Sequence, residues 1–305
     1  SGVNYYATDR IGSHVVEYPF RVGHESAGVV EAVGPAVTQV KTGDRIAVEP
    51  AISCFECDQC KAGRPHTCRN LLFLGCPGQV DGCLSEFIVM PQQSCFPIKD
   101  SMSFEQAALS EPLAIGWYAV KNSLPVEGKA IGILGVGPIG LSVLLSALKQ
   151  GADRVYVTDK INGRLEHAKN AGAVWGGNPD EDDIVQAIHS EEPGQLDIVF
   201  ECCGQQDALD QAIELLKPGG TLVIVGIPEG DKVSFSIDKM RHKEITIRNV
   251  RRQVHCVQES LNMIDNKCID VDFMVTHRFS LEDSVKAFDL VDKYEDGVVK
   301  AMVNI

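Results

Sequence analysis

The stretch KAIGILGVGPIGLSVLLSALKQGADRVYVTD, residues 129–159, decides the fold of this chain. It predicts an apolar strand, a glycine-rich turn, an apolar helix and a second strand. Gly135, Gly137 and Gly140 form the pattern G-x-G-x-x-G where the first strand meets the helix. In this context the glycines allow a tight turn, close approach of the backbone to a pyrophosphate, and close helix–strand packing. The amino terminus of the helix would offer its free N–H groups to the phosphates of a dinucleotide.

An acidic residue ends the second strand of this motif. Asp159 lies 19 residues after Gly140, where a carboxylate would bind the ribose hydroxyls of the cofactor. A glycine-rich turn that only packs against its neighbours would not need this acid. Asp159 favours NAD over NADP because its charge would repel a 2′-phosphate. Lys160 and Arg164 follow closely and weaken that preference, and we assign Arg164 to the cofactor-binding residues.

Alternation of strands and helices continues through the second half of the chain. The runs DIVFECC, TLVIVGI and EITIRNV predict strands at 197–203, 221–227 and 244–250. Helices are predicted at 180–190 and 205–217, the second ended by Pro218, Gly219 and Gly220. This order indicates a doubly wound parallel sheet, the Rossmann type of nucleotide-binding domain.

The sequence outside this region has a different texture. Before residue 118, short valine-rich runs are broken by Gly, Pro and Asp, which predicts an antiparallel β domain. After about residue 263, short runs return that could rejoin this domain. We therefore expect a fold of the α/β plus β class. A Rossmann NAD-binding domain at 119–262 would be inserted in a β-rich catalytic domain formed by 1–118 and 263–305.

Composition excludes several classes of protein. The chain has 305 residues, 44% of them hydrophobic and 23% charged, with a formal net charge of −14. This charge disfavours a nucleic-acid partner, which needs clustered Lys and Arg. No run reaches the roughly 20 apolar residues of a membrane span, and no signal peptide precedes the first polar residues. Most of the 11 cysteines are scattered rather than arranged as a disulfide framework, which favours a reducing, cytoplasmic location.

Four cysteines are tightly spaced. Cys54, Cys57, Cys60 and Cys68 follow the pattern C-x2-C-x2-C-x7-C. Such gaps let the thiolates converge on one tetrahedral ion, and we expect zinc. Two disulfides, an iron–sulfur cluster and a small nucleic-acid-binding finger are the alternatives. Because four thiolates fill a tetrahedral zinc, this site would be structural, and the chemistry must lie elsewhere.

Further motifs point to a known family. Gly23-His24-Glu25, TGDRIAVEP at 42–50, the cysteine motif, EPLAIG at 111–116 and the glycine pattern occur in this order. Together they resemble the zinc-dependent medium-chain alcohol dehydrogenases, in particular the sorbitol/xylitol (polyol) dehydrogenase branch, over essentially the whole chain. The resemblance implies that the β-rich domain is GroES-like. It also implies a catalytic zinc held by a Cys, by His24 and by carboxylates that include Glu111.

Each implied ligand has a simpler alternative. Glu25 would either bind the zinc or orient the site as a second carboxylate. His24 could instead be an ordinary histidine of a surface strand. Glu111 could be a carboxylate at a helix start, facing the helix dipole.

The amino end departs from the family pattern. The family reads C-G-[S/T]-D-x-H-Y, whereas this chain opens SGVNYY. When Tyr5 is aligned with the family Tyr, as a residue facing the substrate, Ser1 takes the place of the proton-relay hydroxyl. We then expect the zinc-ligand Cys before Ser1, in an amino-terminal segment outside the sequence given. In the other register Ser1 replaces the Cys itself.

The resemblance implies hydride transfer from a secondary alcohol of a polyol to NAD, with zinc polarising the substrate oxygen. It also implies a homotetramer. Arg252 in NVRRQ resembles an Arg that meets polyol hydroxyls, and the adjacent Arg251 leaves a phosphorylated substrate open. Activities like L-threonine 3-dehydrogenase or another zinc alcohol dehydrogenase are alternatives. A non-catalytic nucleotide-binding relative that has lost the catalytic zinc is a third.

Overall fold

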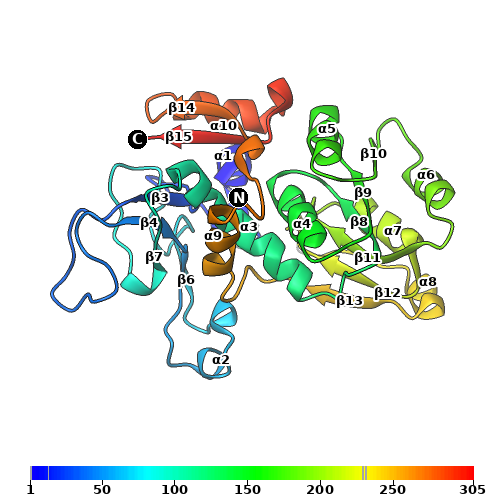
Figure 1. Ribbon diagram of the computed structural model, residues 1–305, viewed down its shortest axis with the longest axis horizontal. Coiled ribbons are helices and arrows are strands. Elements are labelled where there is room, and N and C mark those ends of the chain that lie inside the picture. The colour runs from blue at the N-terminus through cyan, green and yellow to red at the C-terminus, as the bar shows by residue number, and fades with distance from the viewer. Residues whose placement is uncertain (1, 13, 229, 231) are drawn as a thin grey trace. The chain divides into compact units, whose positions relative to one another are not determined.

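The structure, a computed structural model, describes residues 2–12, 14–228, 230 and 232–305, and it divides into two compact units (Figure 1). The first unit comprises residues 1–114 and 254–305, and the second comprises residues 115–253. The chain passes from the first to the second inside helix α3 (Phe104–Lys121). The sequence-based proposal places the domain boundaries at 118/119 and 262/263.

The second unit is built on a six-stranded parallel sheet with the strand order β10-β9-β8-β11-β12-β13. Its strands are β8 (Ala130–Leu134), β9 (Arg154–Thr158), β10 (Trp175–Gly177), β11 (Leu196–Glu201), β12 (Leu216–Ile224) and β13 (Thr246–Asn249). The first strand of this sheet in sequence is β8. The chain adds β9 and β10 on one side of β8, and then β11, β12 and β13 on its other side. Between β8 and β11 the order reverses, and open α/β sheets bind ligands at the carboxyl ends of such strands.

Helices connect these strands and cover the sheet. They are α4 (Pro138–Lys149), α5 (Asn162–Asn170), α6 (Ile184–Glu191), α7 (Gln206–Leu215) and α8 (Ile237–Lys243). Every residue of β8 is buried, as expected for a central strand with helices on the sheet. One boundary expected from sequence is wrong: α7 ends at Leu215, and β12 begins at Leu216. Pro218, Gly219 and Gly220 therefore lie within β12 instead of ending the helix.

The first unit is β-rich and contains several small sheets. Strands β3 (Ser26–Val29), β4 (Arg45–Val48) and β7 (Cys95–Pro97) form an antiparallel sheet. Strands β1 (Arg10–Ile11) and β2 (His14–Val15), and β5 (Ala51–Ile52) and β6 (Leu72–Phe73), form antiparallel pairs. Ile46, Val48 and Leu74 lie at the centre of a small core cluster of this unit. The antiparallel β structure expected before residue 118 is therefore present.

The carboxyl-terminal segment belongs to the same unit. Strands β14 (Val275–Ser280) and β15 (Lys300–Asn304) pair in parallel. The helices of this unit are α1 (Gly2–Thr8), α2 (Asp58–Lys61), α9 (Val257–Asp265) and α10 (Ser284–Asp292), with short 3-10 turns η1 (Pro65–Thr67), η2 (Gln92–Ser94), η3 (Asp272–Met274) and η4 (Glu295–Gly297). Across the described ranges, no helix is both long and apolar enough to cross a membrane.

Candidate functional site

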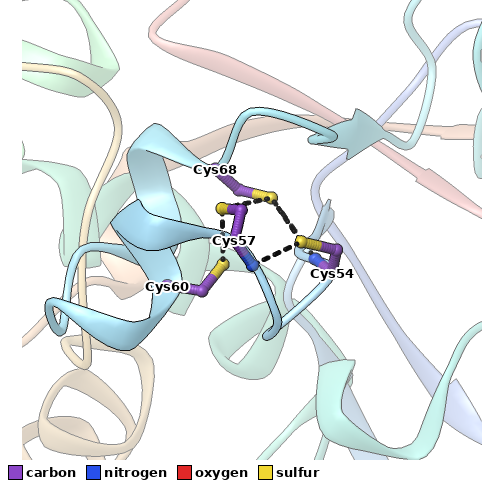
Figure 2. Close-up of side chains that lie close together, drawn as sticks. All are labelled: Cys54, Cys57, Cys60 and Cys68. Atoms are coloured by element: carbon purple, nitrogen blue, oxygen red, sulfur yellow. Dashed lines mark hydrogen bonds between the residues drawn. The ribbon is translucent and has the colours of Figure 1, made fainter.

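The four tightly spaced cysteines lie in one loop of the first unit, between β5 and β6. Figure 2 shows their sulfur atoms turned toward one another. The Sγ–Sγ distance is 3.4 Å between Cys54 and Cys68, 3.6 Å between Cys57 and Cys60, and 3.8 Å between Cys57 and Cys68. Sulfur atoms on one tetrahedral zinc lie about 3.8 Å apart, whereas a disulfide bond is about 2.05 Å long. The spacing therefore fits a zinc ion and excludes disulfides between these cysteines.

Backbone N–H groups donate to two of these thiols. The backbone N–H of Cys57 donates to Cys54 Sγ at 3.4 Å, and that of Asn70 donates to Cys68 Sγ at 3.3 Å. Donors from the backbone of Glu56 and Cys57 lower the pKa of the Cys54 thiol to about 6. A lowered thiol pKa favours the thiolate, which is the form that binds metal.

The nucleotide motif has the geometry that its glycines predict. Gly135 follows β8, and Gly137 is the N-cap of α4. A Cβ atom on Gly140 would lie 1.9 Å from the carbonyl oxygen of Gly135, so no larger residue fits at this position. In turns of this kind the free N–H groups at the start of the helix can donate to a pyrophosphate.

Two charged residues lie beside this turn. Asp159 accepts hydrogen bonds from the backbone N–H groups of Val136 and Ile161, both at 2.9 Å, so its carboxylate braces the turn. Arg164, on α5, is 8% exposed, and its Nη1 lies 3.4 Å from the position of a Cβ on Gly137. Asp159 and Arg164 thus present opposite charges next to the glycine-rich turn.

A second cluster of possible metal ligands brings together His24, Glu25 and Glu111. Their ligand atoms all lie within 4.8 Å of one another. His24 and Glu25 directly precede β3, and Glu111 projects from α3 with 5% of its surface exposed. One imidazole nitrogen and two carboxylate oxygens match the donors that zinc accepts. Small side-chain rotations suffice, because such atoms lie about 3.3–3.6 Å apart on one zinc.

The backbone before His24 is tightly held. Gly82 donates its N–H to Arg21 O at 2.8 Å, and Cys83 donates to Gly23 O at 2.9 Å. A Cβ on Gly82 would lie 2.1 Å from Val22 O, so only glycine permits this approach. The His24 ring also packs on the Phe73 ring, with the centroids 5.1 Å apart. These contacts fix the direction in which the imidazole points.

The alternative interpretation of Glu111, a carboxylate at the start of a helix, is wrong. Helix α3 begins at Phe104, so Glu111 lies inside the helix and not at its start. Its carboxylate therefore does not face the free N–H groups of the first turn.

Three other predicted site residues are Ser1, Tyr5 and Arg252. Ser1 lies outside the described residues. Tyr5, on α1, is 6% exposed, and its hydroxyl lies 3.9 Å from Cys76 Sγ. Burial, the largest cause, and the nearby Cys76 raise the pKa of Tyr5. Arg252 lies in the second unit, after β13, with a φ angle of 58°. The catalytic and substrate roles of these residues remain predictions.

Family models match both parts of the chain. Residues 1–100 match the alcohol dehydrogenase GroES-like domain, and residues 138–266 match the zinc-binding dehydrogenase domain. Sorbitol dehydrogenase of Bacillus subtilis (strain 168) is 36% identical over 304 residues, which cover 99% of this chain and 86% of that protein. The chain belongs to the zinc-binding medium-chain dehydrogenase family.

Other relatives agree with this assignment. L-arabinitol 4-dehydrogenase of Penicillium rubens is 33% identical to this dehydrogenase over 317 residues, covering 99% of this chain and 82% of that one. A zinc-binding dehydrogenase of Sinorhizobium meliloti 1021, bound to NADP, superposes with a TM-score of 0.90 at 29% identity. That match covers 100% of this chain and 88% of the other.

The comparisons confirm the predicted family and fold class. This dehydrogenase combines a GroES-like domain with a Rossmann sheet, and it is a zinc alcohol or polyol dehydrogenase. That result favours the enzyme over the non-catalytic relative. The cysteine loop is a zinc cluster of the structural type, and the redox cofactor is a nicotinamide dinucleotide.

Two residues near the second cluster were not found from the sequence. Lys300 Nζ forms an ion pair with Glu25 Oε2. Burial lowers the pKa of Lys300 to about 8. Cys83 Sγ lies 4.0 Å from Glu25 O, and burial, the largest cause, raises the pKa of its thiol to about 11. The one signal in the sequence that could have marked Lys300 is its position as a single lysine in the apolar run VVKAMV.

Proposed function

We propose that this dehydrogenase oxidises a secondary alcohol of a polyol such as sorbitol or xylitol, with NAD as the hydride acceptor. The observation that carries the proposal is the cluster of His24, Glu25 and Glu111, because a four-thiolate site leaves no position for a substrate. The sorbitol and arabinitol dehydrogenases among the relatives support a polyol as the substrate class. We also propose that the protein is a homotetramer and that it is cytoplasmic, and both proposals rest on the family resemblance.

The side chains of the cluster would hold the catalytic zinc. His24 offers an imidazole nitrogen beside the Phe73 ring, and Glu111 offers a buried carboxylate from α3. Glu25 offers a second carboxylate, already paired with Lys300. When bound, zinc supplies a Lewis acid that eases loss of the alcohol proton, and the nicotinamide accepts the hydride.

The second unit would hold the cofactor. The N–H groups at the start of α4 would donate to the pyrophosphate, and the Asp159 carboxylate would accept from the ribose hydroxyls. Arg164 lies beside the turn and would add a positive charge near the phosphates. We propose that Arg252 donates to the hydroxyls of the polyol, that Tyr5 faces the substrate and that Ser1 relays the alcohol proton.

A substrate panel tests the proposed function. With NAD, kcat/KM for sorbitol or xylitol is expected to exceed that for ethanol by about 100-fold or more, because a site built to bind hydroxyls discriminates against substrates that lack them. The rate of NADH formation is measured for sorbitol, xylitol, ethanol and L-threonine at saturating NAD. A preference for ethanol or L-threonine over every polyol would refute the proposed substrate class.

Asp159 is expected to set the choice of cofactor. In the parent protein kcat/KM should be higher with NAD than with NADP, and Asp159→Asn should reduce that ratio by about 10-fold or more through lost charge repulsion. Asparagine keeps an oxygen that can accept from the backbone N–H of Val136 or Ile161, so the turn is preserved better than with alanine. Steady-state kinetics with both cofactors decide the matter. A parent enzyme that prefers NADP would contradict the assignment to NAD.

A further inference from the structure

Among the charged residues that the structure describes, Glu201 is the most deeply buried. It ends β11 and is 0% exposed, whereas Glu49, Glu111 and Arg164, which are also buried, are 8%, 5% and 8% exposed. Burial of a charged group is unfavourable unless the group is paired or hydrogen-bonded. The proposed reaction gives Glu201 no role, so its position at the end of a central strand needs another explanation.

The side chain of Glu201 holds the turn that follows its own strand. Its Oε1 accepts hydrogen bonds from the backbone N–H of Cys203 at 2.7 Å and of Gly204 at 2.5 Å. Its Oε2 is also buried, and within the described ranges it has no hydrogen-bond partner. A single carboxylate oxygen therefore fixes two N–H groups of this turn.

The same residue reaches the turn after β12. The carbonyl oxygen of Glu201 accepts from the backbone N–H groups of Val225 and Gly226, both at 2.9 Å. A Cβ atom on Gly226 would lie 2.7 Å from Glu201 Oε2 and 2.4 Å from the nitrogen of Gly204, so only glycine permits this approach. Glu201 thus ties together the turns at the carboxyl ends of β11 and β12.

These two turns lie on the side of the glycine-rich turn that faces away from Asp159. Strand β11 neighbours β8 opposite β9, and a Cβ on Gly135 would lie 2.8 Å from Cys203 Cβ. A dinucleotide with its pyrophosphate at α4 and its adenosine ribose at Asp159, after β9, would extend its other nucleoside toward β11 and β12. That nucleoside carries the nicotinamide.

We propose that Glu201 is a positioning residue that holds the turns after β11 and β12 together and so shapes the surface that receives the nicotinamide half of the cofactor. The inference rests on the proposed placement of the cofactor, but not on the substrate or on the choice between NAD and NADP. Glu201 is fully buried and acts only through the backbone of the two turns. The adenosine half, bound at Asp159 and α4, does not depend on it.

The test compares two ligands that share the adenosine half of the cofactor. In the full chain, affinities are measured by calorimetry for ADP and for whichever of NADH and NADPH the parent binds more tightly. Glu201→Leu keeps much of the volume but leaves the N–H groups of Cys203 and Gly204 unpaired. It should weaken binding of the reduced dinucleotide about 10-fold and change ADP binding by less than about 2-fold. Glu201→Gln keeps an acceptor oxygen and should bind both ligands within about 3-fold of the parent.

A second variant tests the same contact with Glu201 in place. The Cβ of Gly226→Ala would push the two turns apart, so this variant should also lose more affinity for the dinucleotide than for ADP. Gly194→Ala is the matched control in the same unit. Its Cβ would lie 3.4 Å from Glu192 Oε1, an ordinary contact, and it should change neither affinity.

The outcomes separate positioning of the nicotinamide from general support of the fold. Equal losses of dinucleotide and ADP binding in folded Glu201→Leu, or parent-like binding of both, overturn the proposal. So does a Glu201→Gln protein that binds the dinucleotide as weakly as Glu201→Leu. If Glu201→Leu does not fold, Gly226→Ala decides by the same criteria. Asp159→Asn should weaken both ligands, because both contain the adenosine ribose. If Asp159→Asn weakens neither, the proposed placement of the cofactor fails instead.

Discussion

Replacing His24 with alanine is expected to lower turnover roughly 1,000-fold or more, because a zinc Lewis acid contributes several kcal/mol in the transition state. The variant should also lose one of two zinc ions per chain. With the imidazole gone, the cluster retains only the carboxylates of Glu25 and Glu111 from the present set, and carboxylates alone suit Mg²⁺ or Ca²⁺ better than zinc. Zinc content is measured by mass spectrometry and turnover by NADH formation.

The control for this experiment is binding of the cofactor. NADH should bind His24→Ala with the affinity of the parent, because the nucleotide motif at Gly135–Gly140 lies in the other unit. His242→Ala removes an exposed histidine of α8 and should keep both zinc ions and full activity. Normal turnover in His24→Ala would show that this cluster holds no catalytic metal. Loss of NADH binding together with turnover would point to a folding defect.

The nucleotide-binding unit could be predicted largely from local sequence. The turn after β8, the helix α4 and the acid after β9 are consecutive, and each obeys a rule that involves only its neighbours. The prediction is wrong at the end of α7, because Pro218 and the two glycines after it do not end the helix. The structure shows that β12 starts at Leu216, ahead of them, because pairing with Leu196 of β11 overrides the local signal.

The candidate metal cluster was only partly predictable. His24 and Glu25 are adjacent in sequence, but they and Glu111 were all assigned by resemblance, since no local rule brings α3 to the start of β3. Lys300 was missed entirely, because its contact with Glu25 depends on how β15 joins the first unit. Periodicity shows which residues are buried, but it does not show which distant side chains meet.

Replacing Cys57 with alanine is expected to release about one zinc ion per chain and to lower the free energy of unfolding by about 3 kcal/mol or more. In the loop at 53–71, His66 and Cys68 are the only buried residues. Helix α2 buries none of its residues, and Phe55 is 56% exposed. The Asp58–Arg69 ion pair is also exposed, so it contributes little. Loss of the metal should therefore unfold the loop and lower Tm by roughly 6–12 °C.

Activity separates a structural role for the cysteine zinc from a catalytic one. Cys57→Ala protein that remains folded should keep part of its turnover, because the His24 cluster lies outside the cysteine loop. The thiols of Cys54, Cys60 and Cys68 should become reactive toward a thiol reagent under native conditions, since no metal protects them. Cys268→Ala, which removes an exposed cysteine, should leave zinc content and Tm unchanged. If Cys57→Ala abolished turnover while Tm and the second zinc were unchanged, the cysteine cluster would be catalytic, and the assignment of the chemistry to His24 would have to be abandoned.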